Sequence, residues 1–251
     1  MGRLTYVGHA TTLIELDGVT LLTDPLLRDR FGHVRRIAPP VGDLPRADAI
    51  LISHAHRDHL DLPSLRRLPR ELPVLAAPAA AEVMRGDGRD VTAIAPGERA
   101  QVGPLEIVAT RAVHDGRRAP VGRSREAVGF LVEGTVRLYF AGDTDLFEGM
   151  RALAPGLDVA LLPVWGWGPR TGAGHLDPEG AARAAGLLRP RVAIPIHWGT
   201  YASPRVWWRA DPARPAREFE RLAAVHAPGV AVSVLAPGDS LALASAAAAE
   251  L

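Results

Sequence analysis

The sequence predicts a mixed α/β fold. Short apolar runs typical of buried strands recur along the 251 residues, and stretches with helical character lie between the later runs. Hydrophobic residues make up 47% of the chain, enough to build a core, and no Gly/Ser-rich linker or fixed-period repeat divides it. We therefore expect one domain over residues 1–251, with sheets buried between layers of helices.

The chain opens with strands that short turns connect. Residues 4–10, 12–16 and 19–23 have the apolar character of strands, and Asp17-Gly18 is a dipeptide typical of hairpin turns. Later strands are expected at residues 49–53, 105–113, 136–141, 158–164 and 192–196. These strands alternate with helices, as in folds where helices cover sheets.

Helices are expected at residues 63–72, 178–188 and 216–226. Proline lies at or near each start, where its missing N–H costs little. The Pro- and Arg-rich residues 203–215 indicate a surface loop, and the alanine-rich residues 241–251 indicate a frayed or helical tail.

The composition excludes several classes of function. The 29 basic and 28 acidic residues nearly cancel, so no overall field attracts nucleic acid or an anionic membrane, and no nucleic-acid partner is expected. All basic residues are Arg and Asn is absent, which suggests a GC-rich bacterial genome. The chain lacks a signal-peptide pattern and any stretch approaching the ~18 apolar residues of a membrane span, so we expect a cytoplasmic protein without membrane insertion.

Residues 52–61, "ISHAHRDHLD", place three histidines and two aspartates on the turn after a buried-looking strand. In extended backbone His54 and His56 project to the same side and can bind one ion. The neighbours Asp58 and His59 diverge, which indicates a second ion. At this composition the pattern HxHxDH is expected by chance roughly 0.0007 times, so we reject coincidence.

Two ions need further ligands, and candidates lie at the ends of other predicted strands. His114, Asp143 and His197 each follow an apolar run, and the chain has no cysteine that could replace them. Asp143 is the candidate bridge because a carboxylate has two oxygens. The predicted ligands are His54, His56, His114 and Asp143 for one ion, and Asp58, His59, Asp143 and His197 for the other.

These motifs, "HAHRDH", His114, "GDT" and "IPIHWGT", resemble in order those of the metallo-β-lactamase superfamily. "VGHATTLIELDGVTLLTDP" and "GHLDPEGA" are most similar to the branch that contains N-acylphosphatidylethanolamine phospholipase D and ascorbate-6-phosphate lactonase. The resemblance implies an αββα sandwich of two mixed sheets flanked by helices, with the metal site at one edge.

The predicted function is a dinuclear hydrolase in which two divalent cations hold and activate a hydroxide between them. Nitrogen and oxygen ligands suit Zn²⁺ best, with Mn²⁺ or Fe²⁺ as alternatives. We expect an anionic small-molecule substrate, foremost a phosphodiester or related phosphorylated compound. Asp58 and His175 are the predicted catalytic residues; the resemblance places His175 near the substrate as a proton donor or phosphate ligand.

Alternative functions share these ligands. A lactonase or other ester hydrolase uses the same hydroxide, and an RNA-processing nuclease uses the same fold but needs a basic surface that the near-neutral charge does not favour. A di-iron redox protein of this scaffold typically carries Glu where His56 stands. A metal-binding scaffold without catalysis leaves the seven ligand residues without a purpose.

Other residues have structural and functional interpretations side by side. Asp24 is either a turn residue or a hydrogen-bond acceptor for a ligand histidine or its loop. His9 is expected to be a satisfied structural histidine, with a place near the site as the alternative. Hydroxyls of Thr144 and Tyr201 are expected to bond backbone, His33 to lie in a loop, and His226 to end a helix.

Two further sets could contact substrate. Trp165 and Trp167 could form an apolar wall or pack in the core. Arg117, Arg118, Arg123 and Arg125, in the segment 117–125, could gather an anionic substrate, although such a run of charges is more typical of a solvated face.

Overall fold

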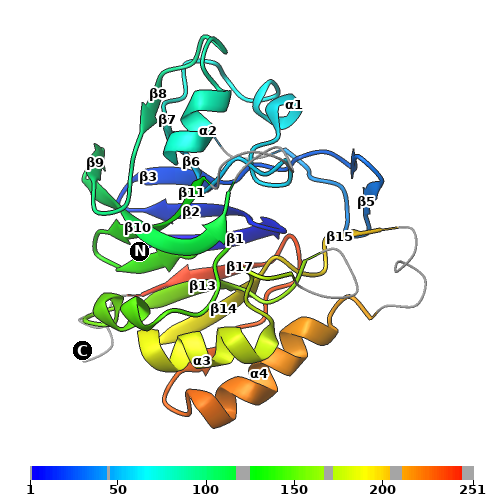
Figure 1. Ribbon diagram of the computed structural model, residues 1–251, viewed down its shortest axis with the longest axis vertical. Coiled ribbons are helices and arrows are strands. Elements are labelled where there is room, and N and C mark those ends of the chain that lie inside the picture. The colour runs from blue at the N-terminus through cyan, green and yellow to red at the C-terminus, as the bar shows by residue number, and fades with distance from the viewer. Residues whose placement is uncertain (1, 44–45, 117–124, 167–171, 204–210, 245–251) are drawn as a thin grey trace.

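The computed structural model describes residues 2–43, 46–116, 125–166, 172–203 and 211–244. Two seven-stranded sheets form its centre, and Figure 1 shows α1 (Leu62–Leu65) and α2 (Pro78–Val83) at one end and α3 (Pro178–Leu188) and α4 (Arg214–His226) at the other. One hydrophobic core of buried side chains runs through both sheets. The layers confirm the predicted αββα sandwich.

The first sheet has the order β17-β1-β2-β3-β6-β7-β8. Its strands are β1 (Gly2–Gly8), β2 (Thr11–Leu16), β3 (Val19–Thr23), β6 (Ala49–Ile52), β7 (Val74–Ala76), β8 (Val91–Ala93) and β17 (Ser240–Leu243). The strands from β3 to β8 pair in parallel, so their carboxyl ends lie at one edge of the sheet.

The second sheet has the order β16-β14-β13-β12-β11-β10-β9. Its strands are β9 (Arg99–Val102), β10 (Leu105–Asp115), β11 (Glu126–Glu133), β12 (Leu138–Phe140), β13 (Val159–Pro163), β14 (Val192–Ile196) and β16 (Ala231–Val232). The strands from β12 to β16 pair in parallel. A short 3₁₀ helix, η1 (Glu148–Leu153), follows β12 in the chain.

A small third sheet, which the sequence did not predict, has the order β15-β5-β4. It consists of β4 (Arg30–Phe31), β5 (Val34–Arg36) and β15 (Tyr201–Ala202). Tyr201 pairs with Arg36, so the segment after β14 is tied to the segment after β3. Segments that lie far apart in the sequence therefore meet beside the same sheet edge (Figure 1).

The helix predicted at residues 63–72 is wrong in length. Asp61 caps its start by accepting from Ser64 N at 3.0 Å, but α1 ends at Leu65. Leu68 precedes Pro69, and a residue before proline is disfavoured in helical backbone. The predicted helices near α3 and α4 are confirmed, with α4 beginning two residues earlier at Arg214. Residues 204–210 of the predicted loop lie outside the described residues.

The prediction for the C-terminal segment is also wrong where the structure describes it. Ser240–Leu243 forms β17, which pairs with β1 in antiparallel register. β1 would otherwise present an unpaired edge, and filling that edge outweighs the weak helical preference of alanine. Helix α2 and strands β7, β8, β9 and β11 are further elements that the sequence did not predict. Within the described residues, no helix combines the length and apolar character needed to span a bilayer.

Candidate metal centre

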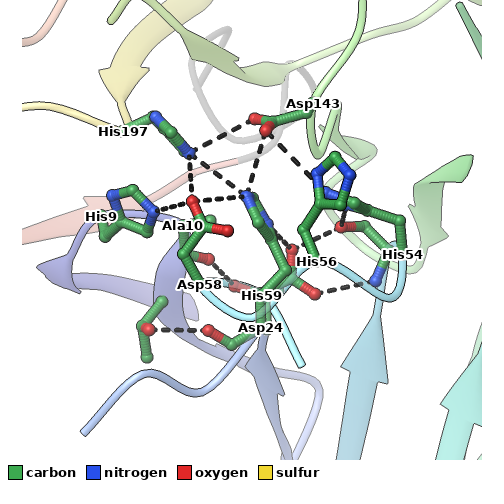
Figure 2. A network of polar contacts seen from close by, with 12 residues as sticks. His9, Ala10, Asp24, His54, His56, Asp58, His59, Asp143 and His197 are labelled. Atoms are coloured by element: carbon green, nitrogen blue, oxygen red, sulfur yellow. Dashed lines mark hydrogen bonds and ion pairs between the residues drawn. The ribbon is translucent and has the colours of Figure 1, made fainter. Parts of the chain in front are cut away.

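The seven predicted ligand residues gather at the edge where the parallel strands end. Residues 54–59 follow β6, Asp143 follows β12 and His197 follows β14, while His114 lies near the end of β10. Parallel strands present their carboxyl ends at the same edge, which is why segments distant in the sequence converge there. Figure 2 shows Asp143 facing His59 and His197, with His54 and His56 on the other side of His59.

The first group consists of His54, His56 and His114, whose ligand atoms lie within 4.8 Å of one another. His114 Nε2 and His56 Nδ1 are 3.2 Å apart. The His54 ring centre lies 4.6 Å from that of His56 and 4.7 Å from that of His114. His54 is buried, whereas His56 and His114 are half-buried.

The second group of predicted ligands consists of Asp58, His59 and His197, and their ligand atoms lie within 4.8 Å of one another and of a ring nitrogen of His9. His59 Nε2 and His197 Nε2 are 3.2 Å apart. Asp58 Oδ2 lies 3.8 Å from His59 Nε2 and 3.9 Å from His197 Nε2. Both imidazoles of this group are buried, and the Asp58 side chain is 14% exposed.

Asp143 faces both groups. Its Oδ2 lies 3.1 Å from His59 Nε2 and 3.9 Å from His54 Nε2, and its Oδ1 lies 3.4 Å from His197 Nε2. The geometry is that expected of a carboxylate shared by two cations.

The residues present fit divalent cations. Two nitrogens that each lie about 2.0–2.1 Å from one tetrahedral Zn²⁺ are separated by about 3.3 Å, close to the two 3.2 Å separations observed. His54 Nε2 and Asp143 Oδ1 are buried without a hydrogen-bond partner among the described residues. Buried polar atoms rarely lack partners, and a cation would satisfy both. That these residues are metal ligands remains a prediction.

The other ring nitrogen of four of the histidines contacts an oxygen. These contacts join His54 Nδ1 to Ser53 Oγ (3.0 Å), His59 Nδ1 to Asp24 Oδ2 (2.7 Å), His114 Nδ1 to Gly174 O (2.8 Å) and His197 Nδ1 to Trp165 O. Each acceptor favours a proton on Nδ1 and leaves the Nε2 lone pair facing the centre. The predicted role of Asp24 as an acceptor for a site histidine is thereby confirmed.

Burial keeps most of these imidazoles neutral. It lowers the pKa of His114 to about 4 and that of His197 to about 3, and it lowers the pKa of His54 well below its usual value. Neutral imidazole is the form that binds metal. Burial also lowers the pKa of His59, but the carboxylates of Asp143, Asp58 and Asp24 raise it well above the usual value. The carboxylates therefore favour positive charge at the centre of the site.

The site is built on left-handed backbone. Among the non-glycine residues that the structure describes, five have positive φ, and three of these lie at this edge. They are His9 (φ 59°), Asp24 (φ 32°) and His197 (φ 66°). His and Asp tolerate this region better than most residues, and such strain concentrates at functional sites.

His175 lies at the rim of the site. Its Nε2 is 3.4 Å from Asp143 Oδ2, its ring centre is 4.6 Å from that of His114, and its side chain is 28% exposed. Burial lowers the pKa of His175, but Asp143 and backbone carbonyls raise it above its usual value. The side chain is thus placed to carry a proton next to the shared carboxylate.

His9 also lies at the site. The sequence favoured a satisfied structural histidine here and gave a place near the site as the alternative.

The hydroxyls of Thr144 and Tyr201 bond backbone as predicted, to Val113 N (2.9 Å) and Leu26 O (3.2 Å). His33 lies between β4 and β5, and His226 is the last residue of α4, as expected.

The residues predicted to contact substrate are only partly described. Trp165 is half-buried and packs against the core, as its structural interpretation predicts. Arg125 Nη1 pairs with Glu82 Oε2 at 3.0 Å on the surface, as expected of a solvated charge. Trp167, Arg117, Arg118 and Arg123 lie outside the described residues.

Known proteins match this chain over most of its length. The family described as "Beta-lactamase superfamily domain" matches residues 20–198, which include all seven predicted ligands. A UPF0173 metal-dependent hydrolase of Opitutus terrae is 35% identical over 250 residues, covering 95% of this chain and 99% of the relative. N-acyl-phosphatidylethanolamine-hydrolyzing phospholipase D 1 of Caenorhabditis elegans is 32% identical over 226 residues, covering 78% of this chain and 64% of the relative. The solved structure of Igni18, a metallo hydrolase from Ignicoccus hospitalis, has a TM-score of 0.72 and 27% identity, covering 96% of this chain and 97% of that one.

Proposed function

The chain belongs to the metallo-β-lactamase superfamily and is a metal-dependent hydrolase. From this premise we propose that it uses two cations to hydrolyse a phosphodiester or related phosphorylated small molecule. The observation that supports a dinuclear site best is the pair of ligand groups on either side of Asp143, each with two nitrogens 3.2 Å apart. We further propose that residues 1–251 form one domain, which the shared hydrophobic core supports.

In this proposal His54, His56 and His114 would hold one ion and Asp58, His59 and His197 would hold the other, and Asp143, which faces both groups, would serve both ions. When bound, two divalent cations lower the pKa of a water molecule to about 7 and polarise a substrate oxygen. The donor set without sulfur favours Zn²⁺, with Mn²⁺ and Fe²⁺ as alternatives.

The protein's own side chains supply orientation and proton transfer. Asp24 accepts from His59 Nδ1 and so keeps the His59 Nε2 lone pair turned to the centre. Asp58 contributes the second group's own negative charge through Oδ2. His175 Nε2, at the rim and 3.4 Å from Asp143, donates a proton to the leaving oxygen or binds a phosphate oxygen. Asp58 and His175 are therefore the proposed catalytic residues.

The choice of a phosphodiester is supported by a relative. The C. elegans protein is named as a phospholipase D, a class of enzyme that cleaves a phosphodiester bond. The nearly balanced charge of this chain supports a small anionic substrate over a polyanion such as RNA.

The test compares substrate classes on one preparation. Protein reconstituted with Zn²⁺, Mn²⁺ or Fe²⁺ is assayed on bis-p-nitrophenyl phosphate, a panel of lactones and tRNA, and anomalous scattering identifies the bound ions. We expect two ions and turnover of the phosphodiester at least about tenfold above that of any lactone, a difference of about 1.4 kcal/mol in activation free energy. His226→Ala, at the exposed end of α4, is the control that keeps full turnover.

Three results would contradict the proposal. Faster turnover of lactones would make the protein a lactonase or ester hydrolase. Cleavage of tRNA with steep loss at high salt would make it a nuclease. A protein that binds two ions and hydrolyses none of these substrates would have another function.

A further inference from the structure

His9 contacts the second group through both side chain and backbone. Its Nε2 lies 3.1 Å from Asp58 Oδ2, and its ring centre lies 3.7 Å from that of His197 with the planes inclined by 36°. The backbone oxygen of His9 accepts from His197 N at 2.7 Å. His9 is only 2% exposed, so these contacts are shielded from water.

The backbone at this corner is constrained to one arrangement. Gly8, the last residue of β1, and His9, which follows it, both have left-handed φ, 131° and 59°. A Cβ on Gly8 would lie 2.7 Å from the Thr200 side chain, so no larger residue fits. Thr200 Oγ1 in turn accepts from His9 N at 2.8 Å. The corner therefore holds the His9 ring in one place, at a cost in backbone strain typical of functional positions.

The contact with Asp58 has the chemistry of ligand orientation. A carboxylate only accepts hydrogen bonds, so His9 Nε2 must be the donor at 3.1 Å. The oxygen that His9 contacts is Asp58 Oδ2, which also faces His59 and His197 (Figure 2), and a ring nitrogen of His9 lies within 4.8 Å of a ligand atom of each of these three residues. A hydrogen-bond donor to a metal-binding carboxylate fixes which way its oxygens point.

We propose that His9 is a positioning residue for the second ion: its Nε2–H orients Asp58 while its ring and carbonyl hold His197. This inference rests on the proposed dinuclear site. Loss of His9 weakens binding of the ion in the second group and leaves the ion of the first group in place, because none of the contacts described for His9 involves His54, His56 or His114.

The test uses three substitutions that separate reach from backbone strain. In His9→Gln the amide nitrogen reaches about as far as Nε2 and can still donate to Asp58. In His9→Asn the side chain is too short, although Asn tolerates left-handed backbone well. His9→Ala removes the donor altogether. His226→Ala is the control for loss of an imidazole remote from the site.

The measurement is Co²⁺ titration of the metal-free proteins, followed by absorption and by Co²⁺-shifted imidazole proton resonances. The resonances tell the groups apart, because the first has three imidazoles and the second two. We expect wild type and His226→Ala to bind two ions. In His9→Asn and His9→Ala the Kd for the ion in the second group rises about 10–100-fold. In His9→Gln this Kd stays within a few-fold of the wild-type value.

Each other outcome overturns the inference. Unchanged affinity in His9→Ala removes any role for the residue. Equal loss in His9→Gln and His9→Ala makes His9 a direct ligand or a packing residue rather than a donor, and if His9→Ala does not fold, His9→Asn against His9→Gln decides the same question. A wild-type protein that binds fewer than two ions contradicts the proposed function instead.

Discussion

The two ligand groups differ in charge and in cover. The first group has three imidazoles and no carboxylate of its own, and two of these imidazoles are half-buried. The second group contains Asp58 between two buried imidazoles. An extra negative charge in a shielded place binds a cation more strongly than neutral nitrogens near solvent. We infer that the second group holds its ion more tightly and that the first is the more open to exchange and substrate.

The groups also differ in what supports them. Asp24 Oδ2 contacts His59 directly at 2.7 Å. The same oxygen accepts from Ser53 Oγ at 2.5 Å, and Ser53 Oγ lies 3.0 Å from His54 Nδ1. One buried carboxylate thus supports the second group by a direct charge-assisted hydrogen bond and the first through a hydroxyl. Equal-looking histidines of one motif are therefore not equivalent.

Removing metal should have the largest effect. Dialysis against a strong chelator should abolish turnover. The ion held by the first group should leave before the ion held by the second group. A metal ion present at 100 times its Kd stabilises the folded protein by about 2.7 kcal/mol. Its removal should therefore lower the Tm of a chain of this length by about 5–10 °C. Metal analysis at intermediate chelator concentrations and thermal melting check this. Restoration by added Zn²⁺ is the control, and simultaneous loss of both ions would contradict the inferred difference.

Asp143→Asn should rank next, because it affects both groups. The substitution keeps the shape but removes the shared negative charge, so turnover should fall roughly 10³-fold, about 4 kcal/mol in activation free energy. Bound metal should fall below two ions per chain. The matched control is Asp145→Asn in the same loop, since Asp145 Oδ1 accepts only from neighbouring Leu146 N at 2.7 Å in the described structure. Turnover within threefold of wild type in Asp143→Asn would exclude a shared carboxylate.

The sequence predicted the side chains that follow the strand ends at this edge. His54, His114, Asp143 and His197 stand out because each follows an apolar strand, and parallel strands carry their ends to one edge. Asp24 was found by the same signal, at the end of β3. Their coming together follows from topology, which the alternation of strands and helices already indicates.

The contacts that distinguish the two groups could not be predicted. Ser53 Oγ and Gly174 O are groups of a kind that occurs throughout any chain, and only the tertiary structure selects them. His9 was expected to be structural because a single histidine after a strand carries no spacing signal. The strand at Ser240–Leu243 was missed for a related reason: its partner β1 lies at the other end of the chain.

Asp24→Asn and Ser53→Ala form a matched pair that separates the groups. Asp24→Asn leaves His59 Nδ1 without a charged acceptor, so the Kd of the second ion should rise about 10–100-fold, and stability should fall by about 1–3 kcal/mol. Ser53→Ala keeps the contact between Asp24 and His59. It should raise only the Kd for the ion in the first group, by about tenfold. Co²⁺ titration and urea unfolding measure both effects. Equal weakening of both ions by Ser53→Ala would contradict the difference in support.

Gly174→Ala should have the smallest effect and confine it to the first group. Gly174 has φ 79°, and a Cβ there would lie 3.3 Å from His114 Nδ1, so the His114 ring must give way slightly and its contact with the Gly174 carbonyl is disturbed. The left-handed alanine costs about 1–2 kcal/mol of stability, and the Kd of the first ion should rise about threefold to tenfold, below the loss of a whole supporting contact. Gly156→Ala is the control, because its φ of 69° imposes the same strain and no described atom lies within 4 Å of the added Cβ. Urea unfolding should show similar destabilisation in both variants, whereas Co²⁺ titration should change only in Gly174→Ala. If both variants weaken the first ion equally, strain rather than the Gly174 carbonyl sets its affinity, and the support assigned to the first group is wrong.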